Sequence, residues 1–316
     1  MPWHALLDRP ARLPVHANLA EGYSVLLQRL GPLTPFELAT QGARLMATPG
    51  LAFLVGYQAA LRALWPSAPH SLGALCATEQ RSLRPLDMQT RLDDLRLSGR
   101  KDFVTAGDAA DWLLIAARCE APGEKPRLTL AVVLAGEPGV RVEPLPAIPL
   151  MPDISHGRVH LDHAACERLP GDGWDDYVKP FRTLEDTYVL SAMTAWLHGI
   201  GQECDWPQAL RLQLLALLAG CAEVVRQPSA SAAGHVLLGG LFVQFEALKA
   251  QVNQAMGAGP WAAMWQRDQA VLDLAASARA KRLEKALSPA PADCGMSLCG
   301  SGLARDSRGA GNTGGD

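Results

Sequence analysis

The spacing of apolar residues changes twice along this chain of 316 residues, and the two changes limit the folds open to it. Residues 18–65 carry apolar side chains at helical spacing, with breaks at 31–35 and 48–50, which predicts two or three helices. Residues 72–169 are short apolar runs bounded by Gly, Pro or Asp, which is typical of antiparallel strands or a small barrel. Helical spacing returns over 177–287. Such separate blocks favour an α+β fold over alternating strands and helices.

The last block predicts a four-helix bundle. Its candidate helices are 177–199, 207–227, 230–256 and 260–287, and their short links favour antiparallel neighbours. Residues beyond 288 are rich in Gly, Ser, Pro and Ala, so we expect a disordered tail over 289–316. The domains expected before that tail are a short helical domain (1–71), a β-domain (72–170) and the bundle (171–288).

Composition limits the partners and the location of the protein. Lys and Arg number 29 against 32 Asp and Glu, so nothing favours nucleic acid. The longest apolar stretch, 212–225, contains Glu223 and is too short for a membrane span. Seven cysteines without a CxxC pair indicate reduced thiols, and the first residues lack a secretory leader. We therefore expect a cytoplasmic protein with a small-molecule or protein partner.

Four segments of the β-rich block carry a distinctive pattern of residues. They are "LCATEQ" (75–80), "DMQTRLDDLRLSGRKDFVTAGDAADWLLIAAR" (87–118), "PGVRVEPL" (138–145) and "GRVHLDHAACERL" (157–169). Together they resemble the middle domain of the acyl-CoA dehydrogenase family, whose order of helical domain, β-domain and four-helix bundle is the order found above. The resemblance implies that Thr78, Phe103 and Thr105 lie along the ring of a bound FAD. Taken alone, these three would be ordinary strand and core residues.

The resemblance also implies a catalytic carboxylate. The family's reaction removes a proton next to a thioester carbonyl, which requires a base in an apolar pocket. In most relatives the base lies near the last bundle helix, but residues 275–277 here are Ala-Ala-Ser. Glu185 in the first bundle helix is similar to the base of a smaller branch. Its alternative role is a solvated carboxylate beside Asp186 in an early helical turn.

A glycine-containing loop resembles a second family element. "QAMGAGPW" supplies Gln254, Gly257 and Gly259 between the last two predicted helices, where relatives contact the flavin of a neighbouring subunit. The same residues would also suit a plain turn between helices. The resemblance further implies an acyl-CoA substrate, an acceptor like electron-transfer flavoprotein, and a homo- or hetero-oligomer.

Several family elements are altered. "QRSLRPLD" follows Glu79 in place of a Gly-Ser-Asp turn, no Arg-x-x-Phe-Gly loop precedes the second bundle helix, and the N-terminal block is short. Three hypotheses therefore remain: an FAD-dependent acyl-CoA dehydrogenase, a noncatalytic subunit paired with an active relative, and flavin chemistry other than dehydrogenation.

His156, His160 and His163 lie on one predicted strand and suggest no metal site. The segment 279–285, "RAKRLEK", is interpreted as an exposed charge cluster at a helix end.

Overall fold

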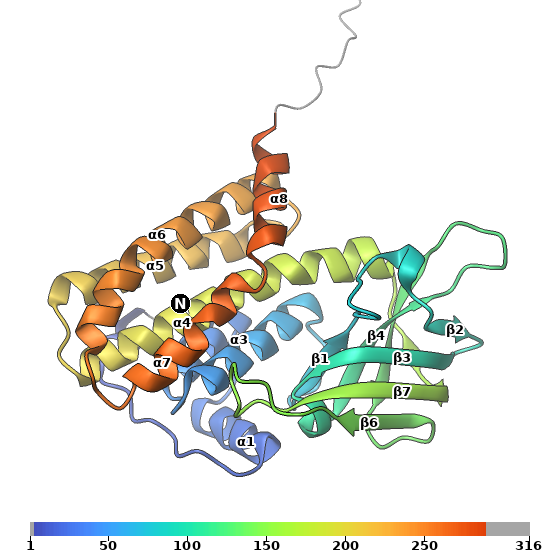
Figure 1. Cartoon of the computed structure of the whole chain (residues 1–316), viewed down its shortest axis with the longest axis horizontal. Coiled ribbons are helices and arrows are strands. Elements are labelled where there is room, and N and C mark those ends of the chain that lie inside the picture. Colours follow the sequence, from blue (N-terminus) through green and yellow to red (C-terminus); the bar gives the residue numbers. More distant parts are fainter. Residues whose placement is uncertain (1–2, 289–316) are drawn as a thin grey trace, which may run out of the picture.

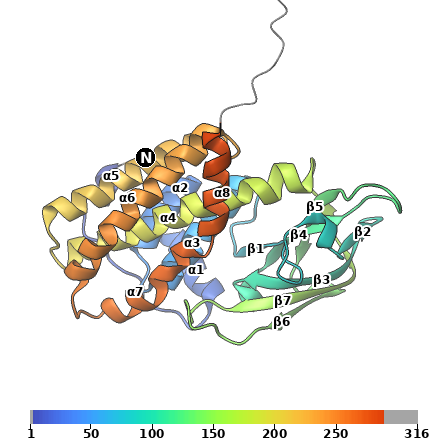
Figure 2. The same cartoon turned by 45° about the horizontal axis from the view of Figure 1, so that its top comes forward.

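The computed structural model describes residues 3–288, so the tail predicted over 289–316 lies outside the described residues. A helical unit and a β unit lie side by side, and one long helix, α4 (Lys179–Glu203), begins beside the β unit and runs into the helical unit (Figure 1). Turning the molecule shows the same two-part arrangement, with the strands gathered on one side (Figure 2). The predicted α+β organisation is confirmed.

The N-terminal block contains α1 (Leu19–Leu30), the short α2 (Pro35–Glu37) and α3 (Pro49–Leu64). Side-chain caps fix where these helices begin. The Asn18 side chain accepts hydrogen bonds from the first turn of α1, and Thr34 and Glu37 form a capping box around α2. Most residues of α3 are buried, because this helix packs along α4 on one side and against the β unit on the other.

The eight strands form one curled, open sheet. The order is β6-β7-β3-β2-β4-β5-β8, with β1 paired to β4. The expected antiparallel pairing holds for most neighbours, but β1 and β2 both run parallel to β4, so the sheet is mixed. The β2–β3 hairpin explains the parallel pairs. The chain reverses between β2 and β3 and again before β4, so β4 runs in the same direction as β2 and β1. The strands are β1 (Gly73–Cys76), β2 (Arg91–Asp93), β3 (Arg96–Thr105), β4 (Trp112–Arg118), β5 (Leu128–Leu134), β6 (Val140–Pro144), β7 (His156–Ala165) and β8 (Glu167–Arg168).

The two faces of the sheet bury different apolar clusters. In β4, Trp112 and Leu114 pack in the core shared with the helices, whereas Leu113 and Ile115 pack inside the curl of the sheet. This alternation is the period of two that a strand requires. The helical face of the sheet is therefore the one available to form a site with α3 and α4.

The bundle contains α4, α5 (Gln208–Arg226) and α6 (Ala232–Met256), while its fourth member is interrupted. A single helix over 260–287 was expected, but the chain forms α7 (Ala262–Asp268), a tight turn and α8 (Ala276–Leu287). Tertiary contacts explain the break. The Asp268 carboxylate accepts the backbone N–H of Met151 at 2.8 Å, and Val271 and Leu272 turn into the core.

Among the described residues, α5 is the one helix whose length and composition would allow it to cross a membrane. Core helices pass the same test. Leu214, Leu217 and Leu218 of α5 are buried, and the helix packs against α4 and α6. Burial covers 33% of its most apolar window, so one face of α5 is buried and the other is exposed.

Gly56 sets the closeness of α3 and α4. A Cβ atom at this position would lie 2.8 Å from the Cβ of Ala192 and 2.9 Å from the carbonyl oxygen of Tyr188. We expect Gly56→Ala to lower the free energy of unfolding by about 1–3 kcal/mol, because the helices must separate. Denaturant unfolding measures the effect. Gly240→Ala is the control, since nothing lies within 4 Å of its Cβ position and the change adds about 0.5–1 kcal/mol of helix propensity. Equal unfolding midpoints for the two variants would contradict the close-packing account.

Candidate active site

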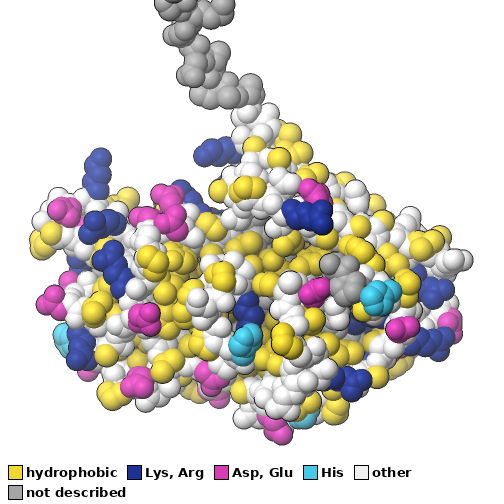
Figure 3. Space-filling model, turned by 180° about the vertical axis from the view of Figure 1, so that it is seen from behind, with side chains coloured by type: hydrophobic (Ala, Val, Ile, Leu, Met, Phe, Trp, Pro, Cys, Tyr) yellow, Lys and Arg dark blue, Asp and Glu magenta, His cyan; other side chains and the backbone are white. Residues whose placement is uncertain are grey.

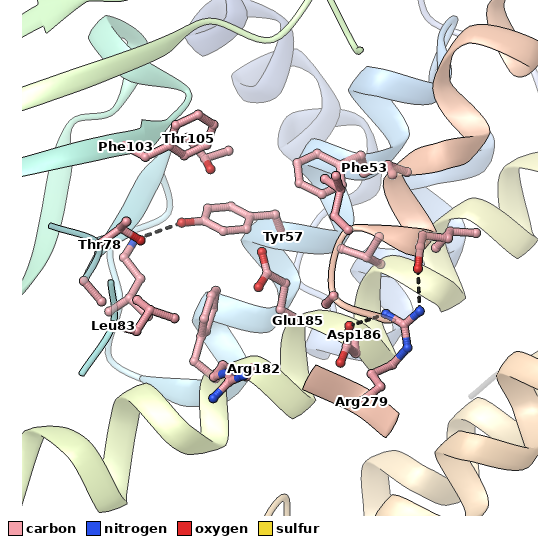
Figure 4. Close-up of a pocket in the computed structure, with 18 of the residues that line it drawn as sticks. Phe53, Tyr57, Thr78, Leu83, Phe103, Thr105, Arg182, Glu185, Asp186 and Arg279 are labelled. Carbon is pink, nitrogen blue, oxygen red and sulfur yellow. Dashed lines mark hydrogen bonds and ion pairs between the residues drawn. The ribbon is translucent and has the colours of Figure 1, made fainter. Parts of the chain in front are cut away.

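A cavity of about 290 Å³ lies where the helical face of the sheet meets α3 and α4. Figure 4 shows part of its lining, with side chains from the β unit on one side and from α4 and α8 on the other. Most of the lining is apolar, which favours binding of an organic ligand over bulk water. Its lining includes Phe53, Tyr57, Leu75, Thr78, Phe103, Thr105, His156, Phe181, Arg182, Glu185, Asp186, Phe242, Ala275 and Arg279.

The three wall residues chosen from the sequence meet in this cavity. Thr78 follows β1, and Phe103 and Thr105 lie near the end of β3. The Phe103 side chain is 42% exposed although it is a large hydrophobic residue, and it faces the hollow. Two hydroxyls and one accessible aromatic face therefore form a wall (Figure 4).

A buried ion pair holds the Thr78 segment against β3. The Lys101 ammonium lies 2.5 Å from the Glu79 carboxylate, and both side chains are almost fully buried. The same carboxylate accepts the backbone N–H groups of Gln89 and Thr90. In addition, the Asp102 N–H donates to the Thr78 carbonyl at 3.0 Å. The wall is thus fixed by groups that do not themselves line the cavity.

Glu185 faces the wall from α4 (Figure 4). Its carboxyl has neither an ion pair nor a hydrogen bond with any residue in the described range 3–288. Burial raises the pKa of Glu185 to about 7, and the neighbouring Asp186 charge adds to the rise, while Arg182 and Arg282 oppose it. A carboxyl in this state can release or accept a proton near neutral pH.

Asp186 occupies a different environment from its neighbour. Its buried carboxylate pairs with Arg279 at 3.0 Å and also with Arg282, both from α8. The two adjacent acids are therefore not a shared polar face, which was the alternative considered from the sequence. The interpretation of 279–285 as an exposed charge cluster was wrong for these two arginines, because they tie α8 to α4. Ala275, at the position where the resemblance implies the base of most family members, lines the same cavity without a carboxylate.

Tyr57 and His156 also line the cavity, although the sequence analysis did not select them. The Tyr57 hydroxyl accepts the Leu75 N–H at 2.9 Å, and burial together with the Glu185 charge raises the pKa of this phenol. His156 pairs with Thr105 across β3 and β7, and its ring lies 4.6 Å from that of Phe103. Burial lowers the pKa of His156. From the sequence, His156 could be placed in the site only if the pairing register of β7 on β3 were known.

Gln254, Gly257 and Gly259 lie at the end of α6 and do not line the cavity. Gly257 has a φ of +57°, which favours glycine, and it ends the helix. The loop is therefore a helix-ending turn within this chain. A role toward the flavin of another subunit stays a prediction.

The histidines of β7 show other partners. The His160 Nε2 atom lies 2.7 Å from the Glu143 carboxylate on β6. Among residues 3–288, no three His, Cys, Asp or Glu side chains are grouped to hold a metal ion.

No protein-family model and no curated protein sequence matches the chain. Solved structures share its fold. FkbI, from biosynthesis of the methoxymalonyl extender unit of the FK520 polyketide immunosuppressant, has a TM-score of 0.57 and 18% identity, over 89% of this chain and 96% of that chain. Butyryl-CoA dehydrogenase from Megasphaera elsdenii has a TM-score of 0.58 and 13% identity, over 79% and 80%. FMN-bound TdsC from Paenibacillus sp. A11-2 has a TM-score of 0.59 and 17% identity, over 84% and 88%. The chain therefore has the acyl-CoA dehydrogenase fold, which confirms the resemblance seen in the sequence.

Proposed function

We propose that this protein is a flavoprotein that dehydrogenates an acyl thioester, with Glu185 as the base. One observation carries the proposal. A carboxyl without a partner among residues 3–288, whose pKa is about 7, faces the wall of Thr78, Phe103 and Thr105 across one cavity. The reaction requires this combination, because the base must be ionised at working pH and must lie opposite the surface that orients the cofactor.

The wall residues fit a flavin. The exposed Phe103 ring offers an apolar surface to a flat ring, and the Thr78 and Thr105 hydroxyls can hydrogen-bond polar ring atoms. The cavity of about 290 Å³ lies just below the range of about 300–1,000 Å³ for ligand sites, so it would hold the flavin ring system while the remainder of an FAD would extend beyond it. TdsC binds FMN, and another protein of this fold is an FAD-dependent dehydrogenase. We propose FAD for this chain.

The chain's own residues supply the proton chemistry and the exclusion of water. Near pH 7 Glu185 is partly ionised, so its carboxylate can accept the proton from the carbon next to the thioester carbonyl. Phe53, Leu75 and Phe181 surround the site with apolar surface, which keeps the carboxyl poorly hydrated. Tyr57 stays protonated and keeps its hydroxyl fixed on the Leu75 N–H. A bound flavin would accept the hydride from the adjacent carbon.

The partners follow from the same proposal. The substrate would be an acyl-CoA or a related thioester, and the electrons would pass to an acceptor like electron-transfer flavoprotein. We also propose an oligomer. The face opposite to that of Figure 1 carries a broad area of hydrophobic side chains across its middle (Figure 3), and such areas are typical of protein contacts.

Flavin binding is the first test. We expect purified protein to show flavin absorption, or to acquire it on addition of FAD. Phe103→Ala is expected to weaken FAD binding by roughly tenfold, because the aromatic contact and its buried area are lost. Fluorescence titration with FAD measures the affinity. Leu134→Ala removes a comparable exposed side chain outside the cavity and should leave the affinity unchanged.

Other outcomes would favour the alternatives. A colourless protein that takes up no FAD, alone or with thioester present, would favour the noncatalytic subunit. A protein that holds FMN and consumes oxygen while modifying a substrate that is not a thioester would favour oxygenase chemistry. Either result would overturn the dehydrogenase proposal.

A further inference from the structure

Tyr57 reaches the wall of the main cavity from α3, and its side chain is held from three sides. Only 3% of the residue is exposed. Its ring forms an edge-to-face pair with Phe181 at 5.6 Å between centroids and lies nearly parallel to Phe53 at 6.2 Å. The Leu75 N–H donates to its hydroxyl oxygen at 2.9 Å. The hydroxyl is therefore fixed, directed at the wall beside Thr105 (Figure 4).

The hydroxyls of Tyr57 and Thr105 are neighbours at this wall. Burial and then the Glu185 charge raise the pKa of Tyr57, while an interaction with the Thr105 side chain lowers it. Thr105 is 9% exposed, lies at the end of β3 and lines the cavity. The Thr105 side chain thus meets Tyr57 on one side and the space for a ligand on the other.

These two hydroxyls carry one more proton than they can share. Each is a donor, and a single hydrogen bond between them uses only one of the two protons. The Tyr57 oxygen accepts the Leu75 N–H, and neither hydroxyl donates to any other acceptor within residues 3–288. One O–H is therefore left without an acceptor from the chain. A buried donor without a partner is costly, so an acceptor atom of a ligand matches this pair.

Acidity decides which of the two protons is left over. A phenol is a stronger acid than an aliphatic alcohol, so the Tyr57 O–H is the better donor and the Thr105 oxygen the better acceptor. The Leu75 N–H donates into the phenol oxygen, and linked hydrogen bonds polarise one another. The remaining proton is that of Thr105, the residue that borders the cavity.

We propose that Tyr57 is a positioning residue for the cofactor: it donates to the Thr105 oxygen and thereby directs the Thr105 O–H at an acceptor atom of the flavin ring. This inference rests on the proposed function, which places Thr105 at the ring. The chain of donors runs from the Leu75 N–H through Tyr57 to Thr105 and ends on the cofactor. Tyr57 acts through Thr105, so its own hydroxyl requires no contact with the ring.

The affinity for FAD and the visible absorption band of bound FAD test this chain of hydrogen bonds. Tyr57→Phe keeps the ring and removes the O–H, and Thr105→Val replaces the hydroxyl by a methyl group. We expect each variant to bind FAD roughly threefold to thirtyfold more weakly, the effect of one lost hydrogen bond in a buried site. Both should shift the absorption maximum in the same direction. Fluorescence titration and difference spectra provide the two measurements.

The double variant separates positioning from a structural role. If Tyr57 acts through Thr105, the two changes remove the same bond to the ring, so the double variant should bind FAD about as weakly as either single variant. If Tyr57 only supports the wall, the two losses should multiply. Tyr188→Phe and Thr194→Val are the controls, since both residues are buried in α4 outside the cavity lining, and they should change neither measurement.

A third variant keeps the test valid if Tyr57→Phe disturbs folding. Tyr57→3,5-difluorotyrosine retains the acceptor for the Leu75 N–H, and its hydroxyl is a stronger donor that burial keeps protonated. It should shift the absorption band in the direction opposite to Thr105→Val, and an unshifted band would refute the role of Tyr57.

The outcomes distinguish this inference from the proposed function. If wild-type protein takes up FAD but Tyr57→Phe has the same affinity and absorption band, or if the losses multiply in the double variant, Tyr57 is no positioning residue and the flavin proposal stands. If wild-type protein takes up no FAD, the proposed function fails, and this inference fails with it.

Discussion

Replacing Glu185 by Gln is expected to slow substrate-dependent flavin reduction by roughly 10²–10⁴-fold, while the affinity for FAD stays unchanged. Glutamine has the same shape but cannot accept the proton. Glu185 contacts no residue in the range 3–288 by hydrogen bond or ion pair, so the substitution removes no structural partner. Stopped-flow reduction of the bound flavin by an acyl-CoA measures the step directly. Glu284→Gln, the same change on the exposed side of α8, is the control.

The pH dependence gives a second measurement on the same residue. Since the base acts when ionised, the rate should rise with pH and level off above the Glu185 pKa of about 7. The stability of the folded protein changes with pH in the opposite direction to the rate. A carboxyl whose folded pKa is raised contributes stability below its unfolded pKa, and this contribution is lost as pH rises through about 7. Glu185→Gln should therefore be more resistant to heat than wild type at pH 8, and equal to it at pH 4.

The outcome separates a catalytic from a structural carboxyl. A variant that reduces flavin at the wild-type rate would remove the base assignment, whatever its stability. A variant that loses flavin as well as rate would place Glu185 in cofactor binding. Asp186→Asn offers a contrast, because it leaves Arg279 and Arg282 without their shared carboxylate and should lower stability.

Local sequence patterns predicted the fold and one wall of the site. The change from helical to strand periodicity marks the boundaries of the units, and four segments of the β-rich block carry the family resemblance that implied Thr78, Phe103 and Thr105. Both signals are short-range, so one sequence is sufficient to detect them. The Leu-Glu pair before a buried helical run also pointed to Glu185, which lines the cavity, and its role as the base stays a prediction.

The remaining features depend on contacts between distant segments. Asp186 is buried and paired because α8 returns to it more than ninety residues later in the chain, and no local pattern predicts which arginines turn inward. His156 joins the site only through the register of β7 on β3. The break between α7 and α8 likewise depends on Asp268 bonding the Met151 backbone. These contacts are set by tertiary packing, so they can be identified only in the three-dimensional structure.

Lys101→Met is expected to have the largest effect on stability. The Lys101–Glu79 pair is buried, so removing one partner leaves an uncompensated charge and should lower the free energy of unfolding by about 3–5 kcal/mol. The melting temperature should fall by roughly 10 °C. Because Glu79 also accepts the N–H groups of Gln89 and Thr90, its disturbance should loosen the Thr78 wall and weaken FAD binding. Lys125→Met, at an exposed position, is the control.

A double variant and a pH series show that the charge pair causes the loss. Replacing Glu79 by Leu in the Lys101→Met background removes both buried charges and should recover part of the stability. Burial alone would raise the pKa of Glu79, but Lys101 and the backbone N–H groups outweigh it and hold that pKa below its usual value. The stabilisation is therefore present above about pH 4.5 and is lost as pH falls through the lower folded pKa. The gap between wild type and Lys101→Met should narrow in acid; a gap independent of pH, with no recovery in the double variant, would point to packing alone.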